Sequence, residues 1–286
     1  MEKTNENKAK KWRKWAAIVC AVLVFAAAVF GVLQLGCVYT EKTWEHWRPS
    51  YEKVDIQTLL EKEILSANEY ELLYRQTGLT KIAVDDMRNS AEGRTRILKI
   101  QEGFFTDYTV KNKLFNIFTY IEKIDGVMRF AYLQDGDIIV SSTTRVSWWR
   151  YGHAAIVINA QTGTIAEAIA PGTKSKTNSI STFNDLANFI ILRPKVDEQT
   201  KKEIVDYVSG EMIGVPYRLT TGIFTKKFQE KLTASQCAHF VWYAYKKFGI
   251  DLDSTGGRVV KPQDMARSEN VEVVQAFGFD LDKLWS

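Results

Sequence analysis

Residues 235–245, SQCAHFVWYAY, join one cysteine to an unbroken run of apolar and aromatic side chains. Ser235 is a good N-cap, and Gly249 can adopt the left-handed conformation that often ends a helix. The stretch therefore predicts a helix from about residue 236 to residue 248. Cys237 is expected in its first turn.

The position of Cys237 gives its thiol two properties. First-turn side chains face unpaired backbone N–H groups and the positive end of the helix dipole, which favours a thiolate. The same N–H groups can hold a developing oxyanion. Because Cys20 lies in an N-terminal apolar run and Cys37 at its edge, Cys237 has no disulfide partner in its own domain. A solitary thiol of this kind is either a buried, inert core residue or a reactive group.

A nucleophilic thiol needs a base, and the chain has 3 histidines. His239 is two residues from Cys237, a rotation of roughly 200° around a helix, so we expect it to point away and to be structural. His46 lies among tryptophans next to the apolar run, where an interfacial role fits. His153 follows Gly152 at the start of an apolar strand and is the candidate base.

Glu167 is the candidate partner that would orient His153. It interrupts an otherwise apolar strand, residues 164–169, and a short turn-rich link joins that strand to residues 154–158. An antiparallel hairpin would bring Glu167 back towards the histidine, as in Cys/Ser-His-acid triads. A glutamate facing solvent on an alternating strand is the alternative.

The rest of the chain alternates between helical and strand-like segments, which indicates an α+β fold. Residues 51–108 have helical spacing with Gly78 and Gly93 as breaks, residues 111–129 are ambiguous, and residues 171–184 read as polar loop. Further expected elements are strands at 137–140, 189–192 and 271–277, and helices at 198–212 and 262–265.

The N-terminus predicts a membrane anchor. Residues 1–14 form a basic tail. Residues 15–36 carry no charge, and this uncharged run is long enough for a helix that spans a membrane. The basic excess puts the N-terminus in the cytoplasm and the remainder outside the cell membrane. A signal peptide cleaved after Ala26–Ala28 and a lipidated Cys37 are the alternatives.

Charge and motifs exclude several functions. The formal charge of +4 is located in the N-terminal tail, so the rest of the chain is neutral and nucleic-acid binding is not expected. The chain has no G-x-S-x-G, H-E-x-x-H, C-x-x-C or phosphate-binding glycine loop. With so few histidines and cysteines, we expect neither a metal nor another cofactor.

Several short motifs occur in one order between about residues 134 and 279. Together they resemble the permuted, YiiX-like branch of the NlpC-like cell-wall peptidase superfamily, in which the histidine strand precedes the cysteine helix. The motifs are GDII (136–139), GHAAIV (152–157), AEA (166–168), GVPY (214–217), SQCAHFVWYAY (235–245), GIDL (249–252) and KPQD (261–264).

The resemblance implies a circularly permuted papain-like fold with an antiparallel sheet packed on helices. It implies that Cys237 attacks, His153 is the base, Glu167 orients it and Tyr217 supports the nucleophile. We therefore expect four parts: a cytoplasmic tail (1–14), a transmembrane helix (15–36), a membrane-proximal, mostly helical module (37–130) and the catalytic domain (131–286).

The expected function is an extracytoplasmic cysteine hydrolase that cleaves an amide or ester bond through an acyl-enzyme thioester. Cell-wall peptide is the substrate class that its relatives suggest. One alternative is a lipid acyltransferase or lipase-like enzyme, because the architecture also resembles the lecithin:retinol acyltransferase group. Another is a non-catalytic tethered binding module, for which Cys237 would be buried or far from His153. The oligomeric state is left open.

Overall fold

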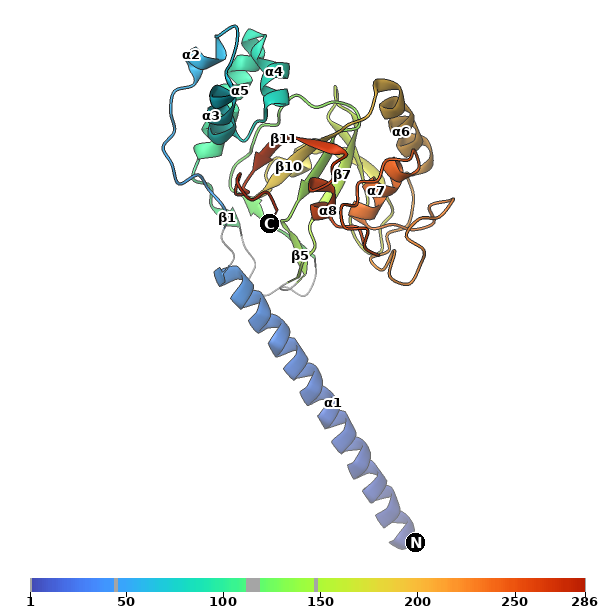
Figure 1. Ribbon diagram of the computed structural model, residues 1–286. Coiled ribbons are helices and arrows are strands. Elements are labelled where there is room, and N and C mark those ends of the chain that lie inside the picture. Colours follow the sequence, from blue (N-terminus) through green and yellow to red (C-terminus); the bar gives the residue numbers. More distant parts are fainter. Residues whose placement is uncertain (1, 44–45, 112–118, 147–148, 286) are drawn as a thin grey trace. The chain divides into compact units, whose positions relative to one another are not determined.

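A computed structural model of the chain describes residues 2–43, 46–111, 119–146 and 149–285. The described residues form two compact units: residues 46–111, 121–145 and 150–285 make up the larger one. The smaller unit contains helix α1 (Glu2–Thr43), drawn in blue in Figure 1. Its segment Lys10–Tyr39 is long and apolar enough to span a membrane.

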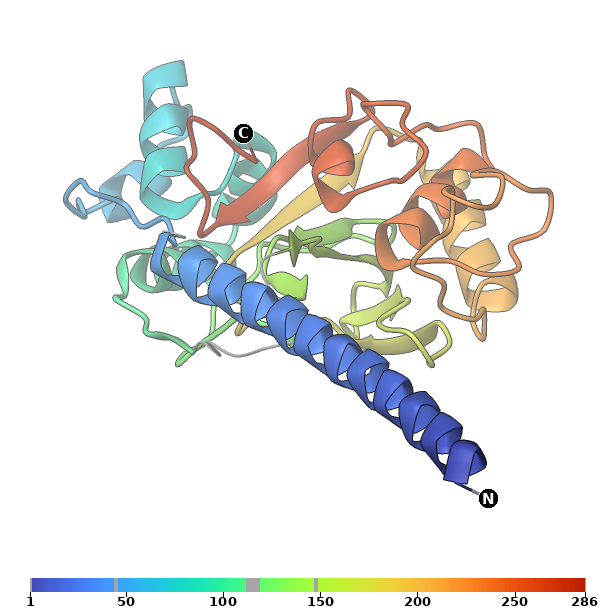
Figure 2. The same ribbon diagram turned by 90° about the horizontal axis from the view of Figure 1, so that it is seen from below.

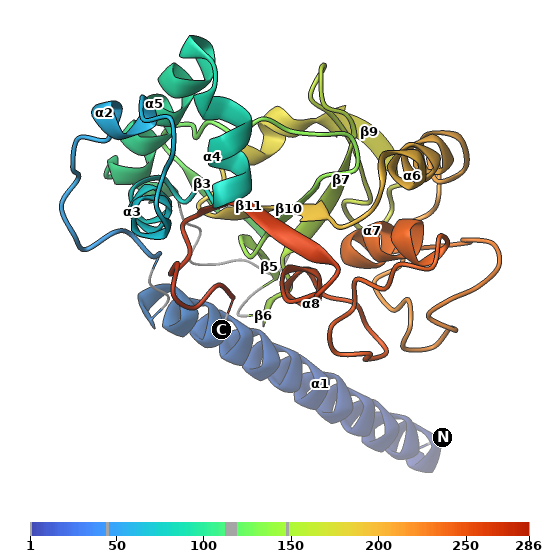
Figure 3. The ribbon, with the colours of Figure 1, turned by 45° about the horizontal axis from the view of Figure 1, so that its top comes forward.

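The larger unit has an α+β fold built on a six-stranded antiparallel sheet (Figure 3). The order across the sheet is β11-β10-β4-β7-β8-β9. Its strands are β4 (Ile138–Ser141), β7 (His153–Asn159), β8 (Thr164–Glu167), β9 (Lys176–Ser179), β10 (Phe189–Pro194) and β11 (Val271–Phe277). Short strands elsewhere are β1 (Val110–Lys111), β2 (Tyr120–Ile121), β3 (Lys123–Ile124), β5 (Thr144–Val146) and β6 (Trp149–Arg150); β1 pairs with β3.

The predicted hairpin is confirmed as β7 and β8. Ile156 pairs with Ala166, which places Glu167 opposite Ala155 on the neighbouring strand. His153 lies two residues before Ala155 on β7, and its side chain is therefore on the same face of the sheet. This diagonal arrangement is within reach of long side chains.

Helices from the C-terminal half of the chain pack against this sheet. Helix α7 (Cys237–Lys246) contacts β7 and β8, α6 (Glu198–Glu211) contacts β7 and α7, and α8 (Pro262–Ala266) contacts β4 and β11. Every residue of α7 from Cys237 to Tyr245 is buried, because apolar side chains surround the whole helix.

The helical segment that precedes the sheet in the chain belongs to the same compact unit as the sheet. It comprises α2 (Gln57–Leu60), α3 (Ala67–Thr77), α4 (Lys81–Arg88) and α5 (Ala91–Phe105). Figures 1 and 2 show these helices at one end of the sheet and α6 and α7 at the other. Helix α4 contacts β11, and Leu79 bridges to Gln275 of the same strand.

The two expected glycine breaks have different roles. Gly78 ends α3, as predicted, and it does so in the left-handed conformation. Gly93 does not break a helix: it lies inside α5, where an added Cβ would overlap the carbonyl oxygen of Met87. Close approach of two chain segments explains this glycine better than a turn does.

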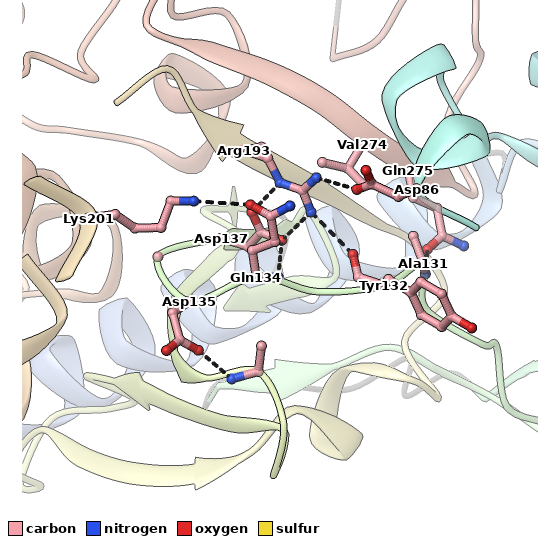
Figure 4. Close-up of polar contacts among 12 residues, drawn as sticks. Asp86, Ala131, Tyr132, Gln134, Asp135, Asp137, Arg193, Lys201, Val274 and Gln275 are labelled. Atoms are coloured by element: carbon pink, nitrogen blue, oxygen red, sulfur yellow. Dashed lines mark hydrogen bonds and ion pairs between the residues drawn. The ribbon is translucent and has the colours of Figure 1, made fainter. Parts of the chain in front are cut away.

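An ion-pair network fixes the segment that leads into β4 (Figure 4). Arg193 of β10 donates to both carboxylate oxygens of Asp137, each at 3.0 Å. It also reaches Asp86 of α4 at 2.7 Å and the carbonyl oxygen of Tyr132 at 3.2 Å. Sheet and helical segment are therefore joined through one guanidinium group.

The segment 171–184 contains more regular structure than its sequence predicts. Residues 171–184 were expected to be polar loop, but they contain β9 and the 3₁₀ helix Ile180–Phe183. Strand β9 lies at an edge of the sheet with mostly exposed side chains, so its sequence lacks the usual apolar alternation. The ambiguous stretch 111–129 lies partly outside the described residues.

Candidate active site

Cys237 is the first residue of α7, so its expected place in the first turn is correct. The expected cap is wrong: Gln236, not Ser235, is the N-cap, and its Oε1 accepts from the Ala238 N–H at 2.9 Å. The Ser235 hydroxyl instead contacts His239 Nδ1 at 2.8 Å. The longer glutamine side chain folds back over the helix start, and its Nε2 donates to the carbonyl oxygen of Val260 at 2.7 Å.

The Cys237 thiol is buried between Gln236 and the start of β7. Its sulfur lies 3.5 Å from Gln236 Oε1 and 3.9 Å from the carbonyl oxygen of Gly152. Gly152 has a φ of +72°, and an added Cβ would stand 2.5 Å from the carbonyl oxygen of Ser141. Glycine is therefore required where the chain passes the thiol and enters the histidine strand.

His153 and Glu167 form a direct side-chain contact. His153 Nε2 and Glu167 Oε2 are 2.7 Å apart, and both side chains are largely buried. Because Nε2 is occupied by the carboxylate, Nδ1 is the ring nitrogen left for the thiol. The structure thus brings together the three residues that the sequence suggested.

The surroundings of His153 favour its charged form. Burial alone would lower the pKa of His153, but the neighbouring Cys237 and Glu167 outweigh it and raise the pKa to about 10. Burial would raise the pKa of Glu167, whereas His153 and Asn178 lower it, so that the carboxylate stays ionised. Opposite charges in one buried cluster stabilise each other in this way.

Two further residues hold this arrangement and were not anticipated. Asn178 of β9 donates through Nδ2 to Glu167 Oε1 at 2.7 Å, so both carboxylate oxygens are engaged. The Phe183 ring stacks on the His153 imidazole, with centroids 5.5 Å apart and an interplanar angle of 17°. Both residues lie in the stretch expected to be loop.

Tyr217 reaches the site through backbone pairing. It forms a parallel bridge with Ser235, two residues before the nucleophile, and its N–H donates to the carbonyl oxygen of Thr173 at 2.9 Å. Burial, together with the nearby Cys237 and Tyr151, raises the pKa of the Tyr217 hydroxyl. Its hydroxyl therefore stays protonated at neutral pH, where it can act as a hydrogen-bond donor.

The other histidines have separate environments. His239 Nε2 contacts the Lys227 carbonyl oxygen at 2.7 Å, and burial lowers the pKa of His239 to about 4. His239 is thus a neutral structural residue, as its helical position predicted. His46 Nε2 lies 4.0 Å from Glu122 Oε2.

The described part of the chain contains no group of three or more His, Cys, Asp or Glu side chains placed to hold a metal. Comparisons with protein-family models, with curated proteins and with solved structures found no match. The function is therefore argued from the geometry of Cys237, His153 and Glu167.

Proposed function

We propose that this chain is a membrane-anchored cysteine hydrolase that cleaves an amide or ester bond through Cys237, His153 and Glu167. The observation that supports it best is the 2.7 Å His153–Glu167 contact next to a thiol at the first residue of a helix. A merely structural cysteine needs neither an imidazole beside it nor a carboxylate behind that imidazole. A circularly permuted papain-like scaffold fits the order of histidine strand before cysteine helix.

In the acylation step, the Cys237 thiolate attacks the carbonyl carbon of the substrate and the carbonyl electron pair moves to oxygen. The backbone N–H of Cys237 has no acceptor among the hydrogen bonds of the described residues, so it can donate to this oxyanion. The C–N or C–O bond then breaks. The His153 imidazolium gives its proton to the departing nitrogen or oxygen, and a thioester remains on Cys237.

In the deacylation step, neutral His153 takes a proton from water as the water oxygen attacks the thioester carbon. The C–S bond breaks, the acid product leaves, and the thiolate–imidazolium pair is restored. Glu167 keeps the ring oriented and stabilises its positive charge throughout. Asn178 holds the second oxygen of Glu167 and so fixes the carboxylate in turn.

A lipid acyltransferase would share the thioester and differ only in its acceptor, an alcohol or amine in place of water. The membrane-spanning candidate helix favours lipid donors for this second candidate. A binding module without catalysis fits the burial of Cys237 but gives no reason for the charged histidine beside it. For either enzyme, the basic residues before the apolar helix favour an orientation with the site outside the cytoplasm.

The test is turnover of a p-nitrophenyl acyl ester by the detergent-solubilised full chain, with intact-mass and peptide analysis of the adduct. We expect acylation of Cys237 and then slow release of acid, or of acyl product when an amine or alcohol is added. Cys237→Ala should abolish both steps, and His153→Ala should slow acylation by at least about 100-fold.

The matched control is the Cys20→Ser, Cys37→Ser double variant, which should keep wild-type turnover. Acylation of Cys237 at the wild-type rate in His153→Ala would overturn the proposed pair. So would turnover that persists in Cys237→Ala.

A further inference from the structure

The segment between Tyr217 and Ser235 exposes apolar side chains next to unpaired positive charges. Leu219, Ile223 and Phe224 are exposed, and Phe224 has 83% of its surface open to solvent. Other exposed apolar residues of the larger unit, such as Ile64 and Val127, stand far apart in sequence. Isolated residues of that kind are ordinary, whereas a cluster indicates a contact surface.

Four exposed cations belong to this segment or to the loop joined to it: Arg218, Lys226 and Lys231 lie in the segment, and Arg258 lies in the neighbouring loop. Within the described residues, none of them has an ion-pair partner. Residues 218–233 contain one acidic residue, Glu230, against four basic ones. We call Leu219, Ile223, Phe224 and the four cations the basic loop surface.

The backbone beneath the basic loop surface is held in place. Lys227 Nζ contacts Asp253 and donates to the Gly257 carbonyl oxygen at 2.8 Å, which joins two loops. The Lys227 carbonyl oxygen is in turn bound by His239 of α7. Tyr243 of α7 also donates to the Gln229 carbonyl oxygen at 2.8 Å.

The two joined loops line a hollow of about 530 Å³ that is open to solvent. Its lining includes Ile223, Phe224, Lys226 and Arg258. In Figure 1 these loops are the orange segments beside α7. The exposed apolar side chains are thus presented by an anchored loop and not by a free tail.

We propose that the basic loop surface docks on a bilayer that carries anionic lipid headgroups. Apolar side chains that enter the acyl boundary, with basic side chains at headgroup level, are the pattern of interfacial membrane binding. A polar or acidic protein partner would leave Phe224 unmatched, and an apolar one would leave the four cations unmatched. Because the same chain has a candidate membrane-spanning helix, that helix would keep the chain at a bilayer.

Docking has a consequence for the candidate site, because the loop begins just after Tyr217 and ends just before Ser235. The bridge between Tyr217 and Ser235 closes the loop at its base, so a bilayer docked on the loop would lie next to the start of α7. The proposal does not depend on catalysis, so Cys237→Ala should dock like the wild type.

The test is hydrogen–deuterium exchange of the full chain in nanodiscs of phosphatidylcholine, with or without phosphatidylglycerol. We expect slower exchange of residues 219–228 in the anionic nanodiscs only. A cation near such a membrane strengthens binding by roughly fivefold, so the Lys226→Glu, Arg258→Glu variant should weaken docking at least about 25-fold and abolish this protection. Phe224→Ser should also reduce it.

Two matched controls separate this surface from general effects of charge and exposure. Lys53→Glu with Lys99→Glu changes two exposed lysines elsewhere, and Ile64→Ser removes another highly exposed apolar side chain; both should keep the protection. Equal exchange in the two nanodiscs would overturn the proposal. Protection that rises with protein concentration and ignores lipid charge would do the same, because it would mark contact between copies of the chain.

Discussion

At neutral pH His153 is charged and His239 is neutral, because their neighbours differ. Both are buried, which lowers the pKa of a histidine. His239 contacts the hydroxyl of Ser235 and a backbone carbonyl and has no carboxylate partner among the described residues, and burial lowers its pKa to about 4. His153 meets Cys237 and Glu167, which raise its pKa to about 10. The charged imidazole that the proposed mechanism needs is therefore set by two side chains.

Glu167→Gln should lower the pKa of His153, because the substitution removes a carboxylate that raises it. Side-chain ¹⁵N spectra of the full chain follow this titration, and single His→Asn variants assign the three signals. His239 should titrate near pH 4 in every variant that keeps this residue. The exposed Glu63→Gln is the matched control and should leave His153 unchanged; a His153 titration near its ordinary pKa in the wild type would contradict this account.

The same shift predicts how stability depends on pH. The pKa of His153 is about 10 in the folded chain against 6.5 unfolded, so its protonation stabilises the folded state fully below pH 6.5. That contribution is lost as the pH rises from 6.5 to about 10. The difference in unfolding free energy between wild type and Glu167→Gln should therefore shrink over this interval.

At the scale of elements, apolar patterns in the sequence located most of the sheet and the helix that carries Cys237. The apolar runs of β4, β7, β10 and β11 are buried in the sheet, and such runs are readable without a structure. The β7–β8 hairpin followed from its short link, and this was enough to place Glu167 near His153.

Elements without an apolar pattern could not be located in this way. Strand β9 is polar, so no apolar pattern predicts Asn178 behind Glu167 or Phe183 against His153. The start of α7 was placed one residue early, because Ser235 is a common N-cap residue and Gln236 is a rare one. Gly93 suggests a helix break in the sequence, because the close approach of the Met87 carbonyl that requires a glycine here is visible only in the structure.

At the scale of the larger unit, Arg193 joins the sheet to the helical segment through Asp137 and Asp86. Arg193→Met should cost roughly 3–5 kcal/mol, because it leaves the buried Asp137 carboxylate without its partner. Urea unfolding of the detergent-solubilised chain measures this cost. Asp86→Asn is the matched control: Asp86 is exposed, so losing its ion pair should cost about 0–1 kcal/mol.

A cost below about 1 kcal/mol for Arg193→Met would contradict the importance of this network. The double variant Asp137→Asn with Arg193→Met should recover part of the loss, since it removes the uncompensated charge. Recovery would assign the effect to charge and not to packing of the arginine side chain.

If His153 activates Cys237, the rate of Cys237 alkylation should depend on the imidazole. An ordinary thiol is only about 0.3% ionised at pH 6, whereas a thiolate paired with a protonated histidine is already reactive there. The measurement is the rate of iodoacetamide alkylation of Cys237 at this pH, read by peptide mass spectrometry, with Cys20 and Cys37 of the same sample as internal references.

Wild-type Cys237 should react at least about 100-fold faster than Cys237 in His153→Ala. Loss of the imidazole opens access to the thiol, so a slower reaction in the variant cannot come from shielding. His153→Gln, which fills more of the site, should behave like His153→Ala. Equal rates in wild type and both variants would contradict the claim that Cys237 and His153 act as a pair.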